Sequence, residues 1–159
     1  MDLGCGTGAE TLDLLSRGWH MLAVDQQAEA IAHIHARLPA EHREHLTTRV
    51  ASCEAVELPA ADFIWASLSL SFPAPHHFPA VWSTIASALK PGGRFAGDFF
   101  GTRHAWADRP AMTVHTREQV TAHCQALSLE DFIEEAGERL TAVEGLQQWH
   151  AFSVIAKKS

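Results

Sequence analysis

The sequence predicts an α/β fold, in which a mostly parallel sheet has helices on both faces and ends in an antiparallel C-terminal hairpin. Two observations support this class. Apolar runs of strand length alternate with segments of helical apolar spacing along most of the chain, and parallel neighbours need such helical crossovers. The last two expected strands have no convincing helix between them, which favours a hairpin.

Five elements are expected in the first part of the chain. In order, they are helix 9–17, strand 21–24, helix 27–38, strand 46–51 and strand 63–68. Gly18 ends the first helix and Pro39 ends the second, because glycine suits a C-terminal cap and proline cannot continue a helix. The last two segments are rich in β-branched and apolar residues, so we expect both to be interior strands.

Five more elements are expected after residue 77. They are helix 78–89, strand 94–100, helix 117–126, strand 129–135 and strand 149–156, with a turn at 90–93 before the second of them. Thr116 can cap its helix, because its hydroxyl can accept a hydrogen bond from the backbone N–H of Gln119. The stretch 101–113 reads as a long irregular loop, and such loops near strand ends often form part of a site.

Length and composition narrow the classes of function. The 159 residues, 47% of them hydrophobic, fit one domain over 1–159, and the net charge of −7 argues against a nucleic-acid partner. Three widely separated cysteines match no disulfide framework or zinc spacing, which indicates a reducing compartment. No apolar run approaches the roughly 18 residues that span a bilayer, so we expect no membrane partner and a cytoplasmic protein.

The chain opens with a glycine-rich loop, Asp2-Leu-Gly-Cys-Gly-Thr-Gly8. Alternate glycines let the backbone approach a ligand closely, and the helix that follows presents amide N–H groups to an anionic group. Asp25 ends the second strand, near the offset at which an acidic side chain accepts hydrogen bonds from ribose hydroxyls. Together these features predict a nucleoside-containing cofactor on a Rossmann-like sheet. A nicotinamide-dependent oxidoreductase stays open, because Gly4, Gly6 and Ala9 satisfy the looser dinucleotide spacing.

The wider pattern distinguishes these alternatives. Asp2-Leu-Gly-Cys-Gly-Thr-Gly8 resembles the first motif of class I S-adenosylmethionine-dependent methyltransferases, and Val24-Asp25 is similar to their second. Leu89-Lys-Pro-Gly-Gly-Arg-Phe95 is similar to the turn before their fifth strand, and the segment 58–64 matches the approach to their fourth. The runs 95–101 and 115–118 are similar to bacterial small-molecule branches, including the tellurite-resistance type.

The resemblance implies S-adenosyl-L-methionine as cofactor and assigns its contacts. Asp2 would help to hold the amino group, the glycines would admit the methionine portion, Asp25 would hold the ribose and Gln26 would border the adenine. The cofactor-binding residues that we expect are Asp2, Gly4, Cys5, Gly6, Gly8, Asp25, Gln26, Ser52, Cys53, Glu54 and Ser67.

Two departures from the family pattern affect these expectations. After the third strand the family often has an acidic residue and then a small one. Here Ser52 and Cys53 stand in those places, with Glu54 one position later. The family's first strand also has several apolar residues before the acidic one, whereas this chain begins one residue before Asp2. We therefore expect a domain that is N-terminally truncated relative to the family, with some apolar surface uncovered.

The expected reaction is methyl transfer to a small molecule by in-line displacement, which needs a base only if the acceptor arrives protonated. His76, His77 and His115 are candidate bases, because imidazole titrates near neutral pH. Asp98, within an expected interior strand, needs a polar partner. The aromatic side chains that could line an acceptor pocket are Phe72, Phe100 and Trp106.

The chain has no Asn-Pro-Pro-Tyr tetrapeptide, which argues against the branch that methylates adenine or glutamine. The run Glu41-His-Arg-Glu-His45 departs from the H-E-x-x-H zinc motif, so no metal site is expected. The alternative function is a domain that binds S-adenosylmethionine without catalysis.

Overall fold

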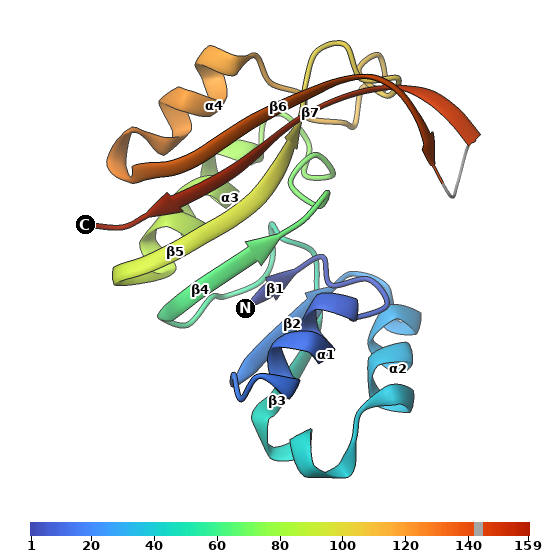
Figure 1. Cartoon of the computed structure of the whole chain (residues 1–159), viewed down its shortest axis with the longest axis vertical. Coiled ribbons are helices and arrows are strands. Elements are labelled where there is room, and N and C mark those ends of the chain that lie inside the picture. Colours follow the sequence, from blue (N-terminus) through green and yellow to red (C-terminus); the bar gives the residue numbers. More distant parts are fainter. Residues whose placement is uncertain (142–144) are drawn as a thin grey trace.

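The computed structural model describes residues 1–141 and 145–159, and within them seven strands form one sheet in the order β3-β2-β1-β4-β5-β7-β6 (Figure 1). The strands are β1 Asp2–Leu3, β2 Met21–Asp25, β3 Leu46–Val50, β4 Ala61–Ala66, β5 Leu89–Phe100, β6 Ser128–Thr141 and β7 Gly145–Lys157. The pairs among β1 to β5 are parallel, and β7 pairs antiparallel with both β5 and β6. The predicted mostly parallel, Rossmann-like sheet with a C-terminal hairpin is confirmed.

The helices lie on both faces of the sheet (Figure 1). They are α1 Ala9–Ser16, α2 Ala28–Arg37, α3 Phe78–Ala88 and α4 Arg117–His123, with short 3-10 helices at Ala40–His45 and Cys124–Ala126. Alternation along β2 shows the two faces, because successive strand side chains point in opposite directions. Val24 packs in the cluster that contains Ile85 of α3, whereas Ala23 packs with Ile31 of α2.

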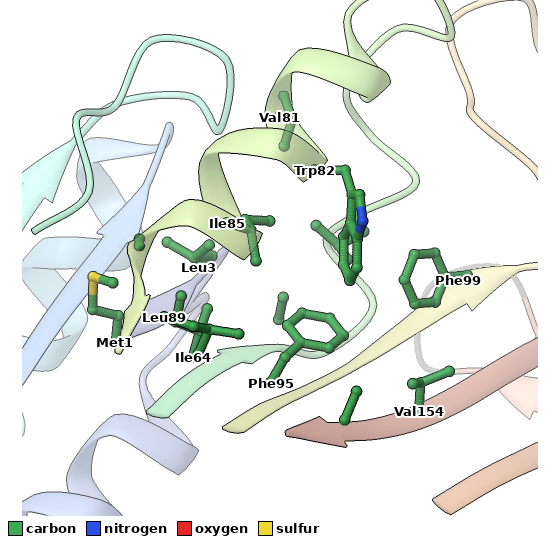
Figure 2. Close-up of a cluster of buried hydrophobic side chains, with 14 of the residues drawn as sticks. Met1, Leu3, Ile64, Val81, Trp82, Ile85, Leu89, Phe95, Phe99 and Val154 are labelled. Atoms are coloured by element: carbon green, nitrogen blue, oxygen red, sulfur yellow. The ribbon is translucent and has the colours of Figure 1, made fainter. Parts of the chain in front are cut away.

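The main core lies between the sheet and α3 (Figure 2). Helical spacing places Val81, Trp82 and Ile85 on one side of α3, and they contact buried side chains of β4 and β5 such as Ile64 and Phe95. The indole of Trp82 also donates a hydrogen bond to the carbonyl of His123, at 2.7 Å. This contact ties α3 to the end of α4.

Strand β3 corrects one prediction. It was expected in the interior, but it forms an edge of the sheet and pairs only with β2 among the described strands. Thr47 and Val50 are accordingly exposed. The chain moves outward from β1 to β2 to β3 and then returns to place β4 on the other side of β1, so β3 has no outer neighbour.

Other boundaries also differ from the sequence expectation, and two of these differences affect the sheet near β5 and the hairpin. The expected turn at 90–93 lies within β5 as an irregularity, because Ala61 pairs with Leu89 and the next pair joins Phe63 to Arg94. The hairpin is longer than predicted, with pairs from Ser128–Lys157 to Thr141–Gly145. Most side chains of β6 are exposed, so no apolar alternation marks its outer half, and the strand is defined there by backbone pairing to β7.

No helix among the described residues is long and apolar enough to cross a membrane.

Candidate functional site

A cavity of about 180 Å³ lies at the carboxyl ends of the parallel strands, beside the point where the strand order reverses at β1. Ligands bind at such switch points in open α/β sheets. The residues that line the cavity are Gly4, Asp25, Gln26, Gln27, Ala51, Ser52, Cys53, Glu54, Ser67, Leu68, Ser69, Phe72 and Pro73. The structure therefore brings together seven of the eleven predicted cofactor-binding residues, from four separate segments.

The glycine loop is anchored to β2 and packed closely against its neighbours. The backbone N–H groups of Gly4 and Cys5 both donate to the carbonyl of Val24, at 2.8 and 3.0 Å. Gly4 has φ +76°, and a Cβ there would collide with the Cβ of Ser69. A side chain at this position is excluded by both the backbone conformation and the space, so the loop backbone itself borders the cavity.

The carboxylate of Asp25 is held in one orientation. It accepts hydrogen bonds from the backbone N–H of Gly6 and from that of Gln27, both at 2.9 Å. One of these donors belongs to the glycine loop, so the loop and the end of β2 are joined through this side chain. Each oxygen uses one acceptor site in these bonds and keeps another, which leaves Asp25 able to accept from a ligand in the cavity.

The stretch after β3 forms the next part of the lining. The backbone N–H of Ala51 donates to the carbonyl of Asp25 at 2.9 Å, which holds this stretch beside the carboxylate. Burial raises the pKa of the Cys53 thiol to about 11, so Cys53 lines the cavity as a neutral, weakly polar group. Ser52 and Glu54 supply the polar side chains there.

The loop after β4 contributes a strained residue. Leu68 has φ +52°, a left-handed conformation that is uncommon for a residue with a side chain, and it lines the cavity. Its backbone N–H donates to Asp98 at 3.2 Å, and the same carboxylate accepts from the hydroxyls of Ser67 at 2.9 Å and Ser153 at 2.6 Å. The expectation that Asp98 needs polar partners is confirmed.

Four predicted cofactor contacts, Asp2, Cys5, Gly6 and Gly8, do not line the cavity. Asp2 is buried beneath the loop, where it accepts a hydrogen bond from the hydroxyl of Thr11 at 2.6 Å, and burial raises the pKa of its carboxyl to about 6. Cys5 is a buried core side chain, and burial raises the pKa of its thiol to about 12. Gly6 and Gly8, which both have positive φ angles, form the part of the loop that does not line the cavity. Their direct contacts with a cofactor stay predictions.

The structure does not bring the three candidate bases to the cavity. His76 and His77 are exposed at the start of α3, with their ring centroids 4.0 Å apart. His115 is buried against Phe78 and Phe99, and burial lowers the pKa of its imidazole to about 4. The physical reason is the turn between β4 and α3, which carries His76 and His77 outward to solvent. Their catalytic role stays a prediction that this geometry does not support.

A second cavity, of about 410 Å³, adjoins the first through shared lining residues, Leu68 and Phe72. Its lining is Leu68, Phe72, Phe100, His104, Trp106, Arg139, Leu140, Thr141, Gln147 and Trp149. The sequence pointed to Phe72, Phe100 and Trp106, but it missed the contribution of the hairpin. No local signal marks Arg139 and Trp149, because only the pairing of β6 with β7 and β5 brings them here.

Gln27, Ser69 and Pro73 also line the first cavity and were not among the predicted cofactor contacts. Their position directly after strands β2 and β4 is a signal that could have indicated them, since ligands bind at the carboxyl ends of strands. No group of three or more His, Cys, Asp or Glu side chains in the described parts of the chain is arranged to hold a metal ion.

The fold is similar to those of several solved structures. TehB from Haemophilus influenzae superposes with a TM-score of 0.84 at 18% identity, over 99% of this chain and 56% of the TehB chain. The N-methyltransferase NodS from Bradyrhizobium japonicum WM9, in complex with S-adenosyl-L-homocysteine, gives 0.75 at 17% identity over 99% of this chain and 76% of NodS. The 1,6-didemethyltoxoflavin-N1-methyltransferase of Burkholderia thailandensis gives 0.75 at 18% identity, over 99% and 71%.

The chain therefore spans little more than half the length of the TehB chain. No curated protein sequence matches it. The family model described as a methyltransferase domain matches residues 1–93, which is more than half of the 159 residues and includes the glycine loop, Asp25 and the loop after β4. The chain belongs to this methyltransferase-domain family and has the class I fold of S-adenosylmethionine-dependent methyltransferases.

Proposed function

We propose that this chain binds S-adenosyl-L-methionine in the first cavity and transfers its methyl group to a small molecule held in the second. The observation that carries the proposal is the Asp25 carboxylate, which lines the first cavity and is held by the Gly6 amide of the glycine loop. A carboxylate placed in this way accepts both hydroxyls of a ribose. The nicotinamide alternative rests only on glycine spacing and has no support from the family.

The residues of the first cavity fit a nucleoside with an attached amino acid. Asp25 would hold the ribose, Ser52 and Glu54 would border the base, and the backbone at Gly4 would pass close to the methionine portion. The collision that a Cβ at Gly4 would cause shows how closely the loop packs against Ser69 at this edge of the cavity. Asp2, whose carboxyl has a pKa of about 6, does not line the cavity. We propose that it does not contact the cofactor's amino group directly and instead helps to hold the loop in position.

When bound, S-adenosyl-L-methionine supplies an electrophilic methyl carbon on a sulfonium, so the protein has mainly to align an acceptor and exclude water. Leu68 and Phe72 lie where the two cavities meet and can do both. His104 lines the second cavity and accepts a hydrogen bond from the backbone N–H of Trp106 through Nδ1, at 3.1 Å. This bond fixes the imidazole as part of the wall of the second cavity.

The second cavity favours an acceptor that needs no base. No carboxylate is among the described residues that line it, and the Nδ1 atom of His104 is engaged. An acceptor that is already deprotonated, or that carries a free lone pair at neutral pH, suits such a site. The names of NodS and of the toxoflavin enzyme describe N-methylation in those proteins, which supports a small-molecule acceptor here. The three free cysteines agree with a reducing, cytoplasmic location.

Calorimetric titration with S-adenosylhomocysteine tests the cofactor site. We expect Asp25→Asn to weaken binding at least about tenfold, because it removes charge from a half-buried hydrogen-bond acceptor. Asp62→Asn is the matched control, since Asp62 is exposed at the amino end of β4, away from the cavity, where it pairs with Lys90. Equal affinity in both variants, or tighter binding of NADH than of S-adenosylhomocysteine, would contradict the proposal.

Transfer is tested separately with cofactor that is radiolabelled in the methyl group and a panel of small acceptors. Labelled product from the unmodified chain supports catalysis. Binding without transfer over the whole panel would favour the alternative of a domain that binds the cofactor without catalysis.

A further inference from the structure

Aromatic rings form most of the wall of the second cavity. Phe100 lies at its centre: its ring stacks on His104 with centroids 3.9 Å apart and an interplanar angle of 9°. The same ring meets Trp106 and Trp149 edge to face, at 5.9 and 5.5 Å. Phe72, which is 51% exposed, meets Trp106 at 6.4 Å and lies at the mouth. Flat faces and edges of this kind suit a planar ligand, because offset and edge-to-face contacts between rings are favourable.

The wall also contains a buried hydrogen-bond donor, the indole N–H of Trp149. The indole N–H of Trp149 is buried and makes no hydrogen bond, and Trp149 itself is only 8% exposed. A buried donor that is left unsatisfied costs free energy, so a ligand with a hydrogen-bond acceptor gains by meeting it. This observation adds a hydrogen-bond donor to the apolar, planar preference of the rings.

The charged side chains around the cavity also favour a ligand with hydrogen-bond acceptors. The guanidinium of Arg139 lies over the Trp149 ring at 4.7 Å, and that of Arg109 lies over the Trp106 ring at 4.5 Å. The indole faces that could attract a cationic ligand are therefore already covered by the protein's own cations. Arg139 also pairs with the carboxylate of Glu135, at 3.6 Å, and Glu135 does not line the cavity. The cavity thus offers positive charge and N–H donors to its occupant.

We infer that the second cavity selects a planar aromatic acceptor that carries an anionic or strongly hydrogen-bond-accepting group, such as an aromatic carboxylate or phenolate. The ring lies among Phe100, Trp106 and Trp149, and the anionic group meets the Trp149 indole and Arg139. A volume of about 410 Å³ suits a one-ring or two-ring compound. The role of this ligand as methyl acceptor rests on the proposed function, whereas its binding does not.

Binding of three matched probes, followed by calorimetry, tests this selection. They are 2-naphthoate, decahydro-2-naphthoate, which is anionic but not planar, and 2-naphthylmethylammonium, which is planar but cationic. We expect 2-naphthoate to bind at least about tenfold more tightly than either of the others, because only it satisfies both the rings and the N–H donors. Equal affinity for the two anions, or tighter binding of the cation, overturns the inference.

Two variants locate the binding. Trp149→Phe keeps a ring but removes the N–H, and Arg139→Gln removes the cation from a side chain that is 56% exposed. Each is expected to weaken 2-naphthoate binding about fivefold to tenfold, the loss of one hydrogen bond to a charged group. Trp19→Phe is the control, because Trp19 is 40% exposed and lines neither cavity. Unchanged affinity in both test variants overturns the inference.

S-adenosylhomocysteine titrations of the same proteins separate the two proposals. Unmodified chain that binds S-adenosylhomocysteine but not 2-naphthoate contradicts the acceptor class and leaves the cofactor assignment standing. The reverse result contradicts the cofactor assignment alone. Unchanged S-adenosylhomocysteine affinity in Trp149→Phe also shows that the variant is folded.

Discussion

At the scale of single residues, two carboxylates at the glycine loop have opposite environments. Asp25 is half-buried, accepts two backbone N–H bonds and faces the first cavity. Asp2 is 2% exposed and has one hydroxyl donor, Thr11. Burial disfavours the charged form of Asp2 and raises the pKa of its carboxyl to about 6. The same residue type therefore serves as a polar contact at one position and as a buried structural group at the other.

This difference gives a pH dependence that Asp2→Asn should remove. Between about pH 4 and pH 6 the unfolded chain has lost the Asp2 proton while the folded chain keeps it, so stability falls as pH rises through this window. Asparagine stays neutral and can still accept from Thr11. We expect the variant to be more stable than the unmodified chain at pH 7, by on the order of 2 kcal/mol, with the difference vanishing near pH 4.

Urea unfolding at pH 4, 5, 6 and 7 measures this effect. Asp62→Asn is the control, because pairing with Lys90 lowers the pKa of the exposed Asp62 carboxyl and should produce no gain at neutral pH. A constant difference between Asp2→Asn and the unmodified chain at every pH would contradict the assignment.

At the scale of elements, α4 is a short helix that depends on its cap. The Thr116 hydroxyl accepts from the Gln119 backbone N–H at 3.3 Å, and the Gln119 side chain accepts from the Thr116 backbone N–H at 2.8 Å. These reciprocal bonds satisfy two donors that a helix start otherwise leaves unpaired. The helix buries Val120 against the main core, so its cap also holds the segment that links the irregular loop to the hairpin.

Thr116→Ala should therefore destabilise the protein by about 1 kcal/mol, the usual worth of an N-terminal cap. Thr121→Ala, an exposed threonine on the same helix, is the matched control and should be neutral or slightly stabilising, because alanine has the higher helix propensity. Chemical unfolding of the two variants side by side measures the difference. Equal stability would show that tertiary packing, and not the capping box, holds α4.

At the scale of the whole molecule, the two faces of the sheet are covered unequally. Along β7, Val154 is 2% exposed within the main core, whereas its neighbour Ile155 is 38% exposed. Ile133 of β6 is likewise 49% exposed. Helices α1 and α2 cover the sheet near β1 to β3 but do not extend over β7 and β6 (Figure 1). Strand alternation thus gives adjacent residues opposite surroundings.

A pair of threonine substitutions tests this layering. Val154→Thr places a hydroxyl in the core and should cost about 1 to 3 kcal/mol. Ile155→Thr changes a partly solvated position to another β-branched residue and should cost less than about 1 kcal/mol. Thermal or urea unfolding compares the two. Equal losses would show that both faces of β7 are buried to the same extent.

The local features around the first cavity and the class of the fold could be predicted from the amino-acid sequence alone. Left-handed glycines, a capping threonine and apolar periods of two or 3.6 residues are properties of neighbouring residues, so the loop, Asp25 and most elements could be located without a structure. The methyltransferase motifs belong to this class, since they lie in contiguous stretches at strand ends.

Features that depend on pairing between distant segments of the chain could not be predicted in this way. The tertiary structure placed β3 at an edge, lengthened the hairpin beyond its apolar pattern and brought Trp149 and Arg139 to Phe72 and Phe100. It also carried His76, a plausible base on chemistry alone, outward to solvent. Strand pairing and cavity walls join residues that lie far apart in the chain. No local hydrophobic period or motif specifies which strands become neighbours in the sheet.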